Sequence, residues 1–188
     1  MTAAPLNEDW PPGTIFTLGH STLPIGRFID LLRAYRIEQL VDIRTVPGSR
    51  HNPQFGGSAL DASLSAVQIR YIYMPDLGGL RHSTKASINT GWRNKSFRGY
   101  ADYMQTPAFA DAVERLIGLG REKRTAIMCA EAVPWRCHRS LVADALEVRG
   151  VEAVEILSET SWRMHKMTPF AHVEGMTITY PPEQATLL

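Results

Sequence analysis

The sequence predicts a three-layer α/β sandwich with a mainly parallel central sheet and helices on both faces. Short runs of β-branched and aromatic residues alternate along the chain with longer segments whose apolar residues recur at helical spacing. The composition is 44% hydrophobic and 21% charged, as in ordinary globular domains. The length of 188 residues suits one domain. We expect an N-terminal extension over 1–13, a single α/β domain over 14–181 and a C-terminal tail over 182–188.

The first half of the chain predicts an alternation of strands and helices. The apolar residues from Ile25 to Tyr35 recur at helical spacing, and Ser21 or Thr22 is the expected cap of that helix. A loop rich in Pro, Gly and Ser over 45–58 separates the second strand from the second helix. The expected elements are a strand at 14–18, a helix at 25–35, a strand at 39–43, a helix at 59–67 and a strand at 70–74.

The second half continues this alternation after a long irregular segment. Residues 75–99 carry glycine and asparagine breaks and predict a surface excursion, which in compact domains is often a functional lid. Thr106 and Pro107 are typical of a helix start. The expected elements are a helix from 107 to 118 or 120, a strand at 124–129, a helix at 140–149 ended by Gly150, a strand at 153–157 and a late strand at 176–180.

Bulk properties exclude several classes of protein. The net charge of +1 predicts no global attraction to nucleic acid, so such binding would need a local patch. No segment approaches the roughly 20 apolar residues that span a bilayer. Two cysteines cannot build a disulfide framework, and the N-terminus lacks the pattern of a secretory signal. We therefore expect a cytoplasmic protein without membrane contact. The cofactor and the oligomeric state stay unknown.

The chemically unusual residues follow the ends of predicted strands. His20 and Ser21 follow the first strand, Asp42 and Arg44 the second, and Cys129 ends a later one. Ligands of open parallel sheets bind beyond the carboxyl ends of the strands. The sequence therefore predicts one site at this edge of the sheet.

The segment from Cys129 to Arg139 resembles the layout of rhodaneses and cysteine-based phosphatases. There, loop amides and a helix N-terminus hold an anion and lower the pKa of the thiol. Arg136, His138 and Arg139 are cationic neighbours, but arginine follows Cys129 by seven and ten positions instead of about six. The resemblance therefore supports the same arrangement of strand, loop and helix more strongly than it supports the same activity. The alternative is that Cys129 is a buried strand residue that packs like a small apolar side chain.

The other candidates also have structural alternatives. His20 is a candidate general base or phosphate contact, or it only bonds a neighbouring strand, and Ser21 is favoured as a helix cap. For Asp42 we expect a salt bridge to an arginine, while Arg44 or Arg50 contacts an anionic ligand.

Residues 75–103 interleave basic and aromatic side chains, a pattern that binds nucleic-acid bases and phosphates. We expect Trp92 and Phe97 to pack instead, which leaves the arginines as better ligand candidates. A metal site from Cys129, Cys137 and His138, with Glu131 or His20, is a weaker alternative because the spacing matches no usual zinc motif.

Several spaced motifs together resemble the domain of unknown function family 488. They cover roughly Thr14 to Pro181. The motifs are Thr17-Leu-Gly-His-Ser21, Leu40-Val-Asp-Ile-Arg44 with Pro47, Ser49, Arg50 and Pro53, Leu77-Gly-Gly79, Phe97-Arg-Gly-Tyr100, Cys129-Ala-Glu131 and Cys137-His-Arg139. The resemblance implies a shared site and names no substrate.

The leading hypothesis is a cysteine-dependent transferase or hydrolase that acts on a phosphorylated, nucleotide-like or other anionic substrate. The alternatives are a non-catalytic nucleotide or nucleic-acid binding module and a metal-dependent enzyme or sensor. The candidate catalytic residues are Cys129, Cys137, His20, His138 and Glu131. The candidate substrate-binding residues are Ser21, Asp42, Arg44, Ser49, Arg50, Arg98, Tyr100 and Arg139.

Overall fold

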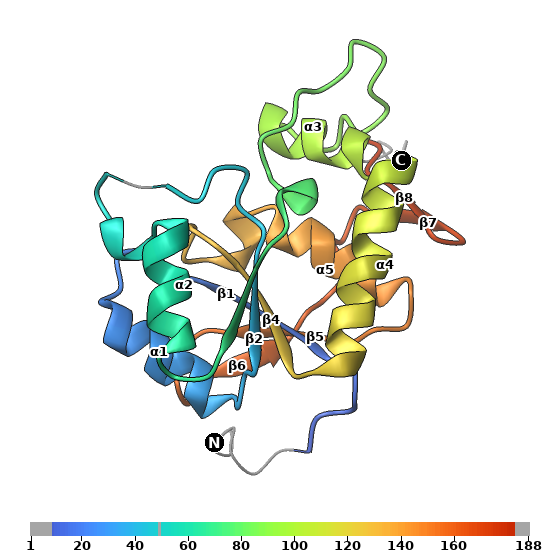
Figure 1. Ribbon diagram of the computed structural model, residues 1–188. Coiled ribbons are helices and arrows are strands. Elements are labelled where there is room, and N and C mark those ends of the chain that lie inside the picture. The colour runs from blue at the N-terminus through green and yellow to red at the C-terminus, as the bar shows by residue number, and fades with distance from the viewer. Residues whose placement is uncertain (1–8, 49, 183–188) are drawn as a thin grey trace.

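A computed structural model describes residues 9–48 and 50–182 of the chain. Within that part, a six-stranded sheet in the order β3-β2-β4-β1-β5-β6 crosses the molecule (Figure 1). β1 to β5 are parallel, and β6 is antiparallel to β5. The strands are β1 (Ile15–Gly19), β2 (Gln39–Asp42), β3 (Arg70–Tyr73), β4 (Thr125–Cys129), β5 (Ala153–Ile156) and β6 (Trp162–Met164). β7 (His172–Glu174) and β8 (Thr177–Thr179) form a separate antiparallel pair.

Helices cover both faces of the sheet, as the sequence predicts (Figure 1). Alternate residues of a strand point to opposite faces, so each strand contributes to two cores. Phe16 packs in the core beneath α1 (Ile25–Ala34) and α2 (Gly57–Ser65). Ile15 packs in the core beneath α4 (Pro107–Glu122) and α5 (Arg139–Glu147). The three-layer α/β sandwich is confirmed.

Most helix boundaries agree with the predictions, but one cap does not. Thr106 caps α4 by accepting a hydrogen bond from the Phe109 N–H at 3.3 Å. The predicted capping of α1 by Ser21 or Thr22 is wrong, because Pro24 occupies the N-cap without a side-chain bond. Ser21 instead turns the chain at a φ of 46°. Its side chain is therefore placed at the end of β1 and not at the start of the helix.

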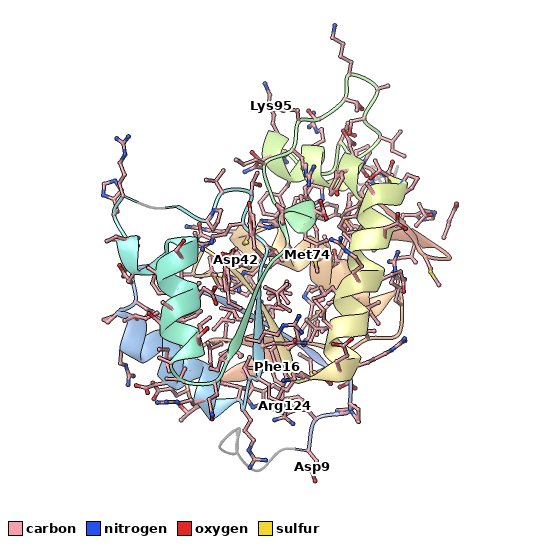
Figure 2. All side chains as sticks on the ribbon, in the orientation of Figure 1. Asp9, Phe16, Asp42, Met74, Lys95 and Arg124 are labelled. Carbon is pink, nitrogen blue, oxygen red and sulfur yellow. The ribbon has the colours of Figure 1, made fainter. Side chains whose placement is uncertain are left out.

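The excursion after β3 is more ordered than the sequence predicts. It begins with the 3₁₀ helix η3 (Pro75–Leu77) and ends in α3 (Lys95–Tyr103), where the Asn94 side chain caps the helix. Figure 2 shows Lys95 on α3, beyond the sheet edge marked by Asp42 and Met74. α3 and the loop before it therefore overhang the carboxyl ends of the strands.

The chain before β1 is anchored to the sheet. Trp10, within the predicted extension, packs edge-on against Phe16 and Trp162, with ring centroids 5.6 and 4.6 Å away. Two further short helices, η2 (Pro53–Phe55) and η4 (Pro134–Arg136), lie in the loops after β2 and β4. Across residues 9–48 and 50–182, we find no helix that is long and apolar enough to cross a membrane.

Candidate functional site

A crevice lies where the connections of two neighbouring strands diverge. The chain leaves β1 for α1 on one face of the sheet and leaves β4 for α5 on the other. Such a switch point is where open α/β sheets bind ligands. The two strands stay paired past their ends, since the His20 N–H donates to the Cys129 carbonyl oxygen at 3.0 Å. A cavity of about 600 Å³ opens there.

Segments distant in sequence line this cavity. They come from the loops after β1, β2 and β4, from residues 79 and 80, and from the start of α3. The lining residues are His20, Ser21, Thr22, Arg44, Thr45, Val46, Gly48, Asn52, Gly79, Leu80, Ser96, Phe97, Cys129, Ala130, Glu131, Arg136, Cys137 and His138. The wall thus combines sulfur, imidazole and guanidinium groups with apolar side chains.

Two free thiols lie in the cavity wall. Cys129 is the last residue of β4, and its Sγ accepts a hydrogen bond from the Glu131 N–H at 3.3 Å. Cys137 precedes α5, and its Sγ accepts one from the Arg139 N–H at 3.5 Å. The two sulfurs also lie close enough for each thiol to shift the pKa of the other. Each sulfur is therefore held in place by backbone at the site.

The environment divides the two thiols into an acidic one and a weakly acidic one. Burial raises the pKa of Cys137, but hydrogen bonds from Cys129 and His138 and the charges of His138 and Arg139 outweigh burial and lower it well below its usual range. Burial, the hydrogen bond with Cys137 and the Cys137 charge raise the pKa of Cys129. The donors and cations around Cys137 therefore favour it as the more acidic thiol of the pair.

His138 links Cys137 to the end of β2. Its Nε2 lies 3.1 Å from the Ile43 carbonyl oxygen, and its Nδ1 lies 3.5 Å from the Cys137 Sγ. A carbonyl oxygen only accepts, so Nε2 carries a proton and Nδ1 is the atom that can exchange a proton with the sulfur. The Tyr100 ring packs against the imidazole at 5.1 Å, and its hydroxyl donates to the Leu77 carbonyl oxygen.

Arg139 places a buried positive charge beside both sulfurs. Its side chain is 1% exposed, and Nη2 donates to the Glu131 carbonyl oxygen at 2.8 Å. Burial lowers the pKa of Arg139, but the charges of Cys129 and Cys137 outweigh this and raise it. Its Nε has no hydrogen-bond partner. Within the described ranges, no carboxylate forms an ion pair with this guanidinium, and a thiolate at Cys137 would supply its counter-charge.

Gly19 allows the loop from Cys129 to Arg139, here called the thiol loop, to lie directly over the end of β1. A Cβ at this position would collide with the carbonyl oxygen of Glu131 and would lie 3.0 Å from Nη2 of Arg139. The same carbonyl accepts the Arg139 hydrogen bond. The absence of a side chain at Gly19 therefore sets where the loop and the guanidinium lie.

A second buried cluster forms the opposite wall. Arg44 donates from Nε to Asp42 Oδ1 at 2.8 Å and from Nη2 to Oδ2 at 2.5 Å, which confirms the expected salt bridge. Arg44 Nη2 also donates to the Phe55 carbonyl oxygen at 2.8 Å. Tyr71 donates its hydroxyl to Asp42 at 2.7 Å. The Arg44 side chain that lines the cavity is therefore fixed by its bonds to Asp42 and Phe55.

His20 has both ring nitrogens engaged. Its Nδ1 lies 2.8 Å from the Ser21 carbonyl oxygen and its Nε2 lies 3.3 Å from Arg44 Nη1, while the ring stacks on Phe55 at 4.1 Å. Burial is the largest cause of its lowered pKa, and the Arg44 charge adds to it. The neutral ring therefore donates to Ser21 and accepts from Arg44. This arrangement makes His20 a positioning residue for Arg44.

The structure brings together most of the predicted site residues. His20, Ser21, Arg44, Cys129, Glu131, Cys137 and His138 line the cavity. Asp42 and Arg139 are buried behind it, and so is Tyr100.

Among the described residues, Arg50 and Arg98 were predicted to bind substrate but do not line the cavity. Arg50 is exposed, and Arg98 donates to the Trp92 carbonyl oxygen. Ser49 lies outside the described residues. Trp92 and Phe97 pack together at 4.8 Å as predicted, although Phe97 also lines the cavity.

Sequence reasoning missed several lining residues. Thr45 and Asn52 belong to the loop after β2, and Leu80 and Ser96 belong to the excursion after β3. Thr45 directly follows the predicted Asp-x-Arg motif, so its position was the signal that could have found it. Leu80 has no comparable signal, because a single exposed leucine is normal on a protein surface.

The loop after β4 differs from an anion cradle. It contains η4, and the amides of Arg136 and Cys137 donate to the carbonyl oxygens of Val133 and Pro134. These amides are used inside the loop and do not point to a bound anion. As for the metal alternative, the described residues contain no group of three or more His, Cys, Asp or Glu side chains that could hold a metal ion.

Comparison with known families decides the relationship. Residues 24–146 match the family model described as domain of unknown function DUF488. The chain belongs to this family. The matched range includes the motifs from Asp42 to Arg139 but not Gly19-His-Ser21, so it is narrower than the resemblance noted in the sequence. No curated protein and no solved structure matches the chain.

Proposed function

We propose that this DUF488 protein is an enzyme that uses the Cys137 thiolate as a nucleophile on an anionic substrate, phosphorylated or nucleotide-like. The observation that carries the proposal is the burial of Arg139 beside two thiols. A buried charge without a partner costs several kcal/mol, so Arg139 favours the thiolate form of Cys137. The thiolate is the reactive form of cysteine.

Each wall of the cavity has a role in this proposal. His138 exchanges a proton with Cys137 through Nδ1. Arg136 is exposed at the cavity and, within the described residues, has no carboxylate partner, so it is available to an anion. Arg44 adds positive charge from the opposite wall, although Asp42 neutralises part of it.

The arginines of the excursion favour this proposal over a non-catalytic nucleic-acid module. Arg81 donates to the carbonyl oxygens of Gly78 and Asp76 and stacks on Tyr103 at 3.6 Å. Arg98 donates to the Trp92 carbonyl oxygen. Both guanidinium groups stabilise the fold of the excursion, which leaves them fewer donors for phosphates.

Alkylation by iodoacetamide as a function of pH tests the proposal. In the folded protein, mass spectrometry of peptides should show Cys137 modified with a midpoint well below that of the same cysteine in denaturant. Cys137→Ser should remove the low-pH reaction, and Cys129→Ser should keep it. Inorganic phosphate should slow the reaction of the wild type, and Arg136→Glu should weaken this protection. Equal midpoints in folded and denatured protein would show that Cys137 is an ordinary thiol.

A further inference from the structure

Two thiols with pKa values shifted in opposite directions lie in one cavity wall. When one thiol reacts, the other remains beside it as a second thiol. Cys129 and Cys137 both line the cavity, and each sulfur accepts a backbone hydrogen bond, from Glu131 and Arg139 respectively. Arg139 is buried beside both sulfurs, and each thiol shifts the pKa of the other, so the two sulfurs are neighbours in this wall. A single nucleophilic cysteine needs no such partner.

We propose that the cavity reacts with small anionic disulfides and that Cys129 is the second reacting thiol, which closes a reversible Cys129–Cys137 disulfide. The inference rests on the proposed function, because Cys137 is the first nucleophile in both. It names a substrate class, RS–SR with negatively charged R groups, which Arg136 at the cavity attracts.

The steps balance in atoms and electrons. The Cys137 thiolate attacks one sulfur of RS–SR, forms a Cys137–S–S–R bond and releases RS⁻. Cys129 then attacks the Cys137 sulfur, and the second RS group leaves with the Cys129 proton as RSH. The substrate disulfide gains two electrons and the two cysteines lose two. No further oxidant is needed.

The order of attack follows from the contacts. Cys137 receives hydrogen bonds from the Arg139 N–H and from His138, and it has the lower pKa of the two. Cys129 keeps its proton while Cys137 is a thiolate, because two adjacent negative charges repel. Once Cys137 is in a mixed disulfide, that repulsion is gone and Cys129 can ionise beside Arg139.

Arg139 makes the resulting disulfide easy to reduce. The reduced pair carries a negative charge beside a guanidinium that is 1% exposed. The disulfide is neutral and leaves that guanidinium without a counter-charge, so the reduced form is favoured. The pair therefore acts as a reactive couple and not as a structural cross-link.

Reaction with dithiobis(nitrobenzoate), an anionic aromatic disulfide, tests the proposal in the full chain. The wild type should release two thionitrobenzoate ions, keep no adduct and lose two hydrogens in mass. Cys129→Ser should release one ion and keep a stable adduct on Cys137, and Cys137→Ser should lose the fast release. The cationic disulfide cystamine should react at least about tenfold more slowly, as expected for charge steering.

The outcomes separate this inference from the proposed function. A wild type that keeps the adduct on Cys137 would overturn the disulfide but leave Cys137 as a nucleophile. The absence of an adduct on Cys137 in Cys129→Ser would overturn both. Equal rates with cystamine would overturn the anionic substrate class.

The role of Arg139 has its own measurement. Reduction of the wild-type disulfide by dithiothreitol at neutral pH should release one proton to solution, because dithiothreitol gives up two protons and the reduced pair, one thiol and one thiolate, keeps only one of them. The Arg139→Gln variant should hold its disulfide at least about tenfold more firmly than Arg139→Lys, which keeps the charge. Reduction of the wild type without any net release of protons would overturn the counter-charge argument even if the variants do not fold.

Discussion

Helix α5 carries two buried charges, Arg139 in its first turn and Asp144 in its middle, and their surroundings differ. Asp144 is fully buried and accepts hydrogen bonds from His165 at 2.7 Å and from the Tyr180 hydroxyl at 2.8 Å. Thr168 donates to it twice, from its amide at 3.0 Å and its hydroxyl at 2.7 Å. These four bonds occupy both carboxylate oxygens.

The other end of this network is equally well paired. His165 Nδ1 donates to Glu155 at 3.0 Å, and Arg163 also binds that carboxylate. The network joins α5 to the segments after β6 and β8. By contrast, Arg139 has one nitrogen without a hydrogen-bond partner and lies beside the sulfurs of Cys129 and Cys137. The two buried charges therefore differ in how fully they are paired: Asp144 uses both carboxylate oxygens within the fold, whereas Arg139 keeps one donor without a partner.

The largest expected effect is at the paired cluster. Asp144→Ala should lower the free energy of unfolding by about 3–5 kcal/mol, because it leaves His165 and Tyr180 buried without their partner. Denaturant unfolding followed by circular dichroism measures this loss. Asp144→Asn is the matched control and should lose less, since an amide keeps part of the hydrogen bonding. A loss below about 1 kcal/mol for the alanine variant would contradict a structural role.

The second prediction uses the charge of His165. Burial lowers the pKa of His165, but the hydrogen bonds and charges of Asp144 and Glu155 outweigh it and raise the pKa to about 9 from 6.5. A raised pKa stabilises the fold fully below pH 6.5, and the contribution is lost as the pH rises through about 9. The difference corresponds to about 3 kcal/mol. The free energy of unfolding of the wild type should fall between pH 6.5 and about 9, and that of His165→Gln should not. Denaturant unfolding at a series of pH values measures both. The same pH dependence in the two proteins would show that another group causes it.

Gly19→Ala extends the comparison to the backbone beneath the thiol loop. The new Cβ collides with the Glu131 carbonyl, so the variant should lose about 1–3 kcal/mol and change the alkylation of Cys137. Gly118→Ala is the control, because a Cβ there meets nothing within 4 Å in the middle of α4. It should gain about 0.5–1 kcal/mol, as measured by thermal unfolding. Similar effects of the two variants would show that the loop is not tightly placed.

The smallest effect is expected at His20. A glutamine can donate to Ser21 and accept from Arg44 as the neutral imidazole does, so His20→Gln should cost about 1 kcal/mol. The pH midpoint of Cys137 alkylation should stay unchanged. A shifted midpoint would restore His20 as an acid or base of the site, as the sequence first indicated.

Some features were visible in the sequence and others were not. The strands and helices of the sheet follow from apolar periodicity, and Thr106 capped its helix as expected. α3 was missed because its first residues are polar and charged, which resembles a loop. β6 and β7 were missed because three residues are too few to show a period.

The site was only partly predictable for a related reason. The carboxyl-edge rule placed His20, Arg44 and the cysteine loop together, since it depends only on strand order and direction. It says nothing about which side chains face the cavity. Tyr100 and Arg98 therefore looked like ligand contacts, although one is buried against His138 and the other holds the Trp92 carbonyl.

The sequence by itself determined the α/β alternation, the family and the edge at which the reactive residues gather, because these depend on local patterns. Only the tertiary structure decided that Arg139 is buried against Cys129 and Cys137, and which arginine forms the expected salt bridge with Asp42. Burial and partnership come from the packing of β1, β4 and α5, which loop spacing cannot specify. Burial and neighbouring groups set the pKa values of the buried charges and of the two thiols, because desolvation and charge interactions act through space.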